Sequence, residues 1–184
     1  MTKEQKVNVA KIILGVVAVA GLLSVAMVAT NALQVLKMFD GNKRKYNPKY
    51  YFDKKTQDLV NKGFLNVVKE KGNNYVELTK KGEVELQKYL MKENVNKKQK
   101  WDGKWRVFTF DVWEKSRQKR DLLRKEIREF GFIQLQKSVW IYPYECRDFI
   151  ELLKADLNFG KNVRYMIVEN LDNDFILRKN FGLT

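Results

Sequence analysis

Apolar residues in the second half of the chain fall into four runs of strand length. Trp105 to Phe110 is almost continuously apolar and aromatic, which is typical of a sheet strand that is covered on at least one face. Phe132 to Leu135, Val139 to Tyr142 and Val163 to Val168 are further runs of the same kind. We therefore expect four strands in this half.

Two segments between these strands have helical spacing. Asp111 and Glu114 have the order of a capping box at a helix start, and Gly131 marks the end of that helix. The apolar positions that share one face are Leu123, Ile127 and Phe130 in this helix, and Phe149, Ile150, Leu153 and Leu157 in the second. The tail from Asp172 to Leu183 predicts a short extra helix, with Asp172 as its cap and Gly182 as its stop.

The resulting order of elements is β-α-β-β-α-β. In a unit of this size, that order predicts a ferredoxin-like α+β sandwich, in which two helices cover one face of a four-stranded antiparallel sheet. Together with the tail, this unit accounts for residues 101–184.

Several motifs of this half resemble the C-terminal domain of PaaX-type transcriptional regulators. That domain is in turn similar to the small CRISPR-associated adaptation protein of ferredoxin fold. The motifs are, in chain order, Trp101 to Arg106, Phe110-Asp111, the basic helix, Phe130-Gly131-Phe132, Leu135 to Trp140 and Tyr142-Pro143-Tyr144. The resemblance is specific for a family but says little about activity, because one fold serves unrelated functions.

The first half contains a second recognisable pattern. Asn47 as an N-cap and Pro48 at the first helical position predict a helix start, and Gly63 ends this helix. The positions expected on its buried face are Phe52, Thr56 and Leu59. Two strand-like runs, Phe64 to Lys69 and Tyr75 to Leu78, then flank a turn-forming segment from Glu70 to Asn74, and a helix follows from Thr79.

This plan of helices and a basic hairpin is that of a winged helix-turn-helix, and Leu59 to Leu65 with Leu78 to Gly82 resembles that family. PaaX-type regulators also place a winged helix before the ferredoxin-like half. We therefore expect a winged helix-turn-helix DNA-binding domain at residues 5–90 and a ferredoxin-like domain at 101–184. Residues 91–100 are polar and have no apolar face, which predicts a linker.

The segment from Ile12 to Leu36 has two interpretations. It carries no charge and follows several lysines, so its length and flanks are those of a membrane helix. Gly15, Gly21 and polar residues interrupt it, however, and Thr30-Asn31 is a suitable cap for a second helix from Ala32 to Phe39. The winged-helix resemblance favours two short core helices, because such helices bury the back of the recognition helix.

Charge is concentrated in the first half of the chain. The net formal charge is +14, and residues 1–100 contribute +11 of it, which predicts a polyanionic partner such as nucleic acid or an acidic membrane surface. The sequence has no histidine, which excludes catalytic triads and zinc sites that need an imidazole from this chain. The lone Cys146 predicts a passive thiol in a reducing compartment.

The leading hypothesis is a cytoplasmic, DNA-binding transcriptional regulator, specifically a repressor. The helix from Pro48 to Lys62 would enter the major groove of double-stranded DNA, and the hairpin and the preceding basic segment would hold the backbone. The candidate residues are Lys49, Tyr50, Tyr51, Lys54, Lys55 and Gln57 on the helix, Lys69, Lys71, Asn73 and Asn74 on the hairpin, and Lys43, Arg44 and Lys45 before the helix. One of the two tyrosines is expected to pack under the helix. The resemblance implies a homodimer formed through the C-terminal domain and a small-molecule effector.

Two alternatives remain open. Asp111 matches the position where the CRISPR-associated family carries a metal-binding aspartate, so a pair across a dimer could hold one Mg²⁺ for phosphodiester cleavage, with Ser138 nearby. In that case the protein would be a nuclease or an adaptation scaffold, and otherwise no cofactor is expected. Capping explains Asp111 and Glu114 equally well. The second alternative, a membrane-anchored adaptor, rests only on residues 12–36.

Overall fold

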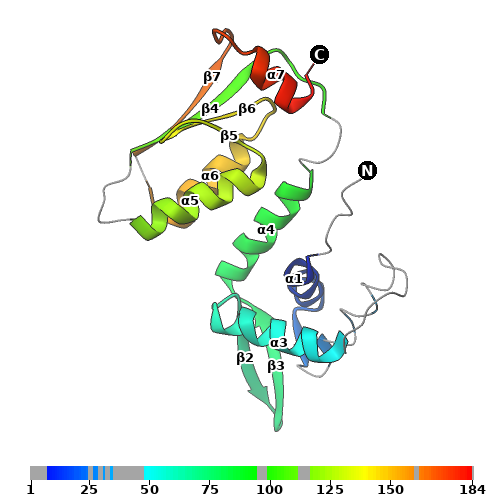
Figure 1. The fold of residues 1–184 in the computed structure, drawn as a ribbon. Helices are drawn as coiled ribbons and strands as arrows, with labels where there is room; N and C mark the ends of the chain where they lie inside the picture. Colours follow the sequence, from blue (N-terminus) through cyan, green and yellow to red (C-terminus); the bar gives the residue numbers. More distant parts are fainter. Residues whose placement is uncertain are drawn as a thin grey trace. The chain divides into compact units, whose positions relative to one another are not determined.

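A computed structural model of the chain divides into two compact units, Met1–Tyr89 and Leu90–Thr184 (Figure 1). The structure describes residues 8–24, 27–28, 31, 34, 48–94, 99–111, 117–159 and 162–183, apart from the side chains of Pro48 and Lys49. Each unit has its own hydrophobic core and its own antiparallel sheet, so the predicted α+β class is confirmed.

The N-terminal unit combines helices with a three-stranded sheet of order β1-β3-β2. Its elements are α1 (Val9–Ala20), β1 (Leu22–Ser24), α3 (Pro48–Asn61), β2 (Leu65–Glu70), β3 (Asn73–Leu78) and the start of α4 (Lys80–Asn94). The predicted inner face of α3 is correct, because Phe52, Thr56 and Leu59 are all buried. They pack with α1, β2 and β3 in one core.

The first part of the uncharged segment is a short core helix, as the interpretation of two core helices predicted, but a strand follows it. Helix α1 ends at Ala20, Gly21 takes a positive φ of 72°, and Leu22–Ser24 then pairs antiparallel with β3. This strand was not predicted, and it interrupts the run that could have formed one long helix. No helix in the described ranges has the length and apolarity needed to cross a membrane.

The second predicted helix of this segment lies largely outside the described residues. Met27, Val28, Asn31 and Gln34 are helical, so helical conformation begins before Asn31. The proposed cap at Thr30-Asn31 is therefore wrong at Asn31. Val28 is buried in the same core as α1, which explains why an apolar sequence is needed here.

Helix α4 extends further than the sequence indicated. Residues 91–94 belong to the helix, so the predicted linker at 91–100 is wrong for these four positions. Met91 packs against the core of the C-terminal unit, and Lys92 forms ion pairs with Glu126 and Glu129 at 2.7 and 2.8 Å. These contacts hold the end of α4 in a helix although its sequence is polar.

Replacing Gly82 with alanine should destabilise the N-terminal unit by about 1–3 kcal/mol. Gly82 is buried in the first turn of α4, and a Cβ there would overlap the carbonyl oxygen of Phe64. The matched control is Gly15→Ala in α1, where a Cβ meets nothing within 4 Å. We expect that change to stabilise by about 0.5–1 kcal/mol. Urea unfolding followed by far-UV circular dichroism measures both, and equal effects would contradict the packing argument.

The C-terminal unit is built on a four-stranded antiparallel sheet of order β5-β6-β4-β7. Its elements are β4 (Trp105–Phe110), α5 (Arg117–Phe130), β5 (Ile133–Gln136), β6 (Val139–Tyr142), α6 (Arg147–Leu157), β7 (Val163–Val168) and α7 (Phe175–Phe181). Helices α5 and α6 lie together on one face of the sheet, and α7 lies on the other (Figure 1).

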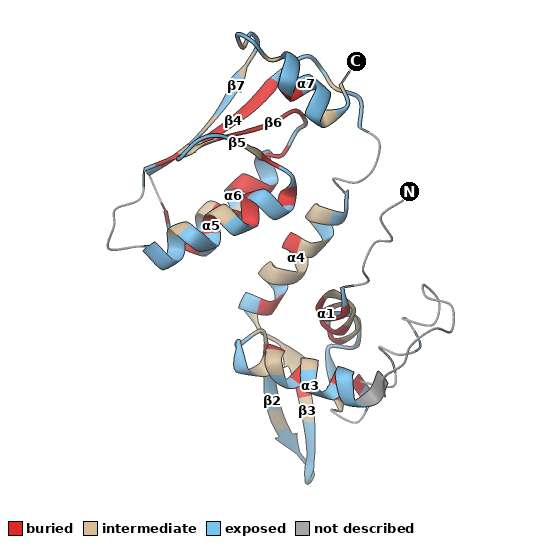
Figure 2. Ribbon diagram, in the orientation of Figure 1, coloured by how far each residue is buried: buried red, intermediate tan, exposed pale blue. Residues whose placement is uncertain are grey.

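Both faces of this sheet are partly buried (Figure 2). Phe108, Phe110 and Trp140 face the core beneath α5 and α6, which also contains the four predicted apolar residues of α6. On the opposite face, Trp105 and Ile141 pack with α7. Burial on both sides explains the continuous apolar sequence of β4.

Two helices of this unit were predicted to begin at an aspartate. Of the predicted capping box, Asp111 directly follows β4, and Glu114 lies outside the described residues. The cap of α7 is Asp174 and not Asp172, although Gly182 ends the helix as predicted, with a φ of 65°. The Asp174 carboxylate accepts hydrogen bonds from Trp105 Nε1 at 3.0 Å and from Arg178 Nε at 2.9 Å, which fixes the start of α7 on the sheet.

Candidate nucleic-acid interface

Helix α3 has one buried face and one exposed face. Thr56, on the buried side, donates its hydroxyl hydrogen bond to the Phe52 carbonyl at 2.9 Å, so its polar group is satisfied inside the helix. On the other side, Tyr50 and Tyr51 are 68% and 50% exposed, and Lys54 is exposed as well. Neither tyrosine packs under the helix, which corrects that expectation.

The remaining candidates on and before α3 differ in how exposed their side chains are and in whether they are already hydrogen-bonded. Gln57 is exposed, but its side-chain amide donates a hydrogen bond to Asn61 Oδ1 at 3.0 Å. Lys55 is half-buried at the edge of the exposed face. The side chain of Lys49 and the whole of Lys43, Arg44 and Lys45 lie outside the described residues.

The hairpin of β2 and β3 carries its polar side chains around a tight turn. Lys71 and Gly72 form the turn with φ values of 48° and 79°, and Glu70 pairs with Asn73 across it. Positive φ at both central residues is typical of a two-residue hairpin turn. Asn73 and Asn74 therefore belong to β3 and not to the predicted five-residue turn. All four hairpin candidates are exposed; they are Lys69, Lys71, Asn73 and Asn74.

Three more lysines, which were not among the candidates from the sequence, lie where α3 and the hairpin meet α4; they are Lys62, Lys80 and Lys81. Thr79 caps α4 by accepting a hydrogen bond from the Gly82 backbone N–H at 3.0 Å. The Lys81 ammonium donates to the Lys62 carbonyl at 2.9 Å and lies 5.2 Å from the centre of the Phe64 ring. Lys62 and Lys80 are both exposed. The pair of lysines after Thr79 is the feature of the sequence that could have indicated this basic junction.

The exposed groups form a basic surface on one unit. Figure 1 shows α3 lying across the base of the hairpin, whose turn projects beyond it. Residues 48–81 contain eight lysines and four acidic residues, so the local potential is positive. A helix with an exposed polar face beside a lysine-bearing turn has the chemistry for contacting base edges and phosphates together.

Asp111 is exposed at the end of β4. Its backbone N–H donates to the Asn162 carbonyl at 2.9 Å, and it lines a shallow pocket of about 330 Å³ with Thr109, Phe110, Asn162 and Arg164. Ser138 meets this region through its carbonyl, which accepts a hydrogen bond from the Phe110 N–H at 3.2 Å. Within the described ranges, no three acidic or cysteine side chains cluster to hold a metal ion.

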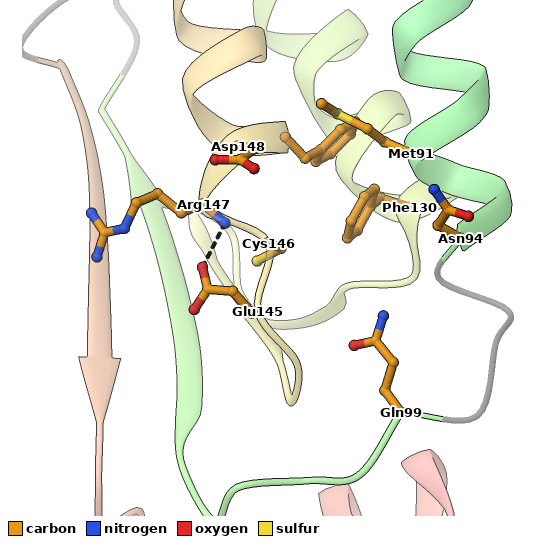
Figure 3. A pocket seen from close by; sticks show the side chains of 9 residues that line it. Met91, Asn94, Gln99, Phe130, Glu145, Cys146, Arg147 and Asp148 are labelled. Carbon is orange, nitrogen blue, oxygen red and sulfur yellow. Dashed lines mark hydrogen bonds between the residues drawn. The ribbon is translucent and has the colours of Figure 1, made fainter.

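A larger cavity of about 440 Å³ lies in the C-terminal unit, beside the start of α6 (Figure 3). Phe130 and Phe149 line it as a stacked pair with ring centres 3.9 Å apart. The Arg147 guanidinium points away from the cavity and lies 5.1 Å from the centre of the Tyr165 ring. The other lining residues are Met91, Asn94, Gln99, Glu145, Cys146 and Asp148.

The polar groups of this cavity have defined electrostatic states. Burial raises the pKa of the Cys146 thiol to about 12, so it is a neutral thiol near pH 7. Burial alone would raise the pKa of Glu145, but the hydrogen bond from the Arg147 N–H, at 2.9 Å, and the charge of Arg106 lower it overall. The cavity is therefore lined by a carboxyl group whose ionised form is favoured, together with the aromatic pair.

Comparison with known proteins concerns the same unit. Residues 98–174 match the family model described as the PaaX protein central Cas2-like domain. No curated protein matches the sequence. The matched region contains all four strands of the second sheet together with α5 and α6. The C-terminal unit is thus similar to the central domain of PaaX proteins.

Proposed function

We propose that this protein is a DNA-binding transcriptional regulator of the PaaX type. The observation that carries the proposal is the exposed polar face of α3 beside the lysine-bearing hairpin turn, in the unit with most of the positive charge. In this proposal the N-terminal unit is a winged helix, α3 enters the major groove, and the β2–β3 hairpin holds the phosphate backbone. The order of helices and strands in that unit supports the assignment.

The C-terminal unit serves as a dimerisation and effector module in this proposal, with a ferredoxin-like fold. Its strand order β5-β6-β4-β7 and its helices on one face support that fold. Strand β7 supports a homodimer, because it is an edge strand six residues long with Met166 41% and Ile167 46% exposed. Strand β5, the other edge, has four residues and an irregular register, which makes it a poorer site for strand pairing.

A small-molecule effector would occupy the 440 Å³ cavity beside α6. Its volume lies within the range of about 300–1,000 Å³ that is usual for ligand sites. Stacked aromatic rings with a few polar groups are also typical of such sites. The protein would act as a cytoplasmic repressor, in which a dimer reads a two-fold site and the effector alters its affinity.

Alanine at Lys54 and at Lys71 should weaken DNA binding in two different ways. Lys71, at the hairpin turn, is placed to contact phosphate, so its loss should weaken all sequences alike and reduce the slope of log affinity against log salt by about one. Lys54 faces outward from α3, and if it contacts a base its loss should also reduce discrimination at one position by about 1–3 kcal/mol. Selection from a random duplex library, followed by titration at several salt concentrations, measures both quantities.

Lys179→Ala in α7 is the matched control, since it removes one exposed positive charge outside the N-terminal unit. It should leave sequence preference unchanged. Unaltered affinity in both the Lys54 and Lys71 variants, with binding still present in the full chain, would show that the winged-helix assignment of function is wrong.

A further inference from the structure

Four arginines lie along one side of α5 in the C-terminal unit. Arg117, Arg120, Arg124 and Arg128 are separated by three, four and four residues, which places them on one face of a helix. We call this set the arginine row. At 1.5 Å per residue it extends over about 16 Å. It belongs to the unit that carries little of the net charge, and the DNA-binding hypothesis from the sequence did not use it.

The middle of the row is held in place by the sheet. Arg124 donates from Nη2 to the Lys137 carbonyl at 3.2 Å, and its guanidinium lies 5.8 Å from the centre of the Phe110 ring. The Arg128 guanidinium lies 5.6 Å from the Trp140 ring centre. Such contacts hold the aliphatic parts of the arginine side chains against apolar surface. Less side-chain conformational entropy is then lost when a ligand binds.

The charge of the row is only partly neutralised. Asp121 approaches Arg117 at 3.9 Å and Arg124 at 3.6 Å, but it is itself 55% exposed. In the described part of the chain, no carboxylate lies within 4 Å of Arg120 or Arg128. The exposed Lys137, at the β5–β6 turn beside Arg124, adds a further positive charge.

The position of these cations opposes the helix dipole. The first turn of α5 contains Arg117, Lys119 and Arg120 and no acidic residue. The N-terminal end of a helix is its positive end, so cations there reduce stability. A local arrangement that costs stability and is only partly neutralised is typical of a functional surface.

We propose that the arginine row binds the phosphate backbone of duplex DNA, as a second contact in addition to the N-terminal unit. The inference rests on the proposed function, because it assigns another surface to the same ligand. Arginine presents a planar fork of donors that matches a phosphate in two hydrogen bonds. A row of about 16 Å is long enough to reach several phosphates of one strand.

The test compares two double variants of the full chain. Arg117→Gln with Arg128→Gln removes two charges from the row, and Lys119→Gln with Lys179→Gln removes two exposed charges outside it. Arg124 is left in place because it donates a hydrogen bond to the Lys137 carbonyl. The row variant should lower affinity for duplex DNA about tenfold at moderate salt, and reduce the slope of log affinity against log salt by about two. Sequence preference should not change, since phosphate contacts carry none.

The charge-matched control should retain affinity within about twofold. Equal losses in the two double variants would show that net charge alone is responsible and would overturn the proposal, as would an unchanged slope in the row variant. Arg117→Glu gives an independent readout, because a reversed charge in the row should weaken duplex binding more than Arg117→Gln does. Equal binding by these two single variants, both folded by far-UV circular dichroism, would count against a functional row.

The same titrations separate this inference from the proposed function. If Lys54→Ala and Lys71→Ala leave binding intact while the row variant loses it, the winged-helix proposal fails and the row stands. If the lysine variants lose binding and the row variant does not, the row proposal alone is wrong.

Discussion

Replacing Lys92 with alanine is expected to reduce the free energy of unfolding of the C-terminal unit by about 3–5 kcal/mol. The Lys92 ammonium lies 2.7 Å from Glu126 Oε2 and 2.8 Å from Glu129 Oε2, and the Glu126 side chain is only 8% exposed. Without the lysine, Glu126 becomes a buried charge with no compensating cation. All four tryptophans lie at positions 101–140, so tryptophan fluorescence in urea reports on this unit alone.

Two controls make the measurement specific. In Lys92→Met combined with Glu126→Leu, both charges are absent, and most of the stability should return because no unpaired charge is left. Lys154→Ala breaks a pair with Glu151 whose carboxylate is 57% exposed, and should cost less than about 1 kcal/mol. If Lys92→Ala lowers the free energy of unfolding as little as Lys154→Ala does, the ion pair at the end of α4 is effectively solvated.

The pH dependence of the Lys92 pair follows from its ionisation. Burial alone would lower the pKa of Lys92, but the hydrogen bonds and charges of Glu126 and Glu129 outweigh it and raise the pKa above 10.5. A raised pKa means that the stabilisation is complete below the pKa of the unfolded chain. It is lost only as the pH rises through the pKa of the folded state.

Local sequence patterns predicted those elements whose signals lie within a few residues. Pro48 and Gly63 bracket α3, and the apolar positions of α6 have the spacing of a buried helix face. The order of strands and helices between Trp105 and Val168 also follows from period and turn residues. These features are determined by short-range backbone preferences and by one buried face.

Elements that depend on distant partners could not be predicted. Leu22–Ser24 is a strand because it pairs with Tyr75, Val76 and Glu77, more than fifty residues away. Residues 91–94 are helical because Lys92 finds two glutamates on α5. Neither contact leaves a periodic pattern in its own segment, so the first was interpreted as helix and the second as linker.

The candidate DNA-binding residues also divide into those whose exposure follows from local patterns and those whose exposure depends on the tertiary structure. Exposure of Lys54 and Lys71 follows from helix and hairpin periodicity, since the buried positions fix the opposite face. The exposure of both Tyr50 and Tyr51 does not follow, because aromatic residues are as common in cores as on binding surfaces. Lys81 gains its position from the junction of α3 and α4, where its ammonium donates to the Lys62 carbonyl, and only the tertiary structure brings these elements together.

Replacing Arg106 with methionine should destabilise the C-terminal unit by about 2–4 kcal/mol. Arg106 is only 5% exposed and donates to both Asp102 carboxylate oxygens, at 2.6 and 2.7 Å. It also donates to the carbonyls of Lys104 and Pro143, at 2.8 and 3.0 Å. Methionine fills similar volume but leaves these carbonyls without a donor. Fluorescence-detected urea unfolding measures the loss, and a change below that expected for a surface pair would contradict the buried network.

Asp102→Asn tests the same network through pH. The hydrogen bonds from Arg106 lower the pKa of Asp102 from 3.8 to about 2, so its contribution to stability is present above pH 4 and is lost as the pH falls through 2. Because this carboxylate is 48% exposed, solvent screening reduces the expected cost of the substitution at pH 7 to about 1 kcal/mol. The difference in unfolding free energy between the wild-type chain and Asp102→Asn should therefore shrink between pH 4 and pH 2. A difference that stays constant over this interval would show that Arg106 is held by the two carbonyls and not by the charge of Asp102.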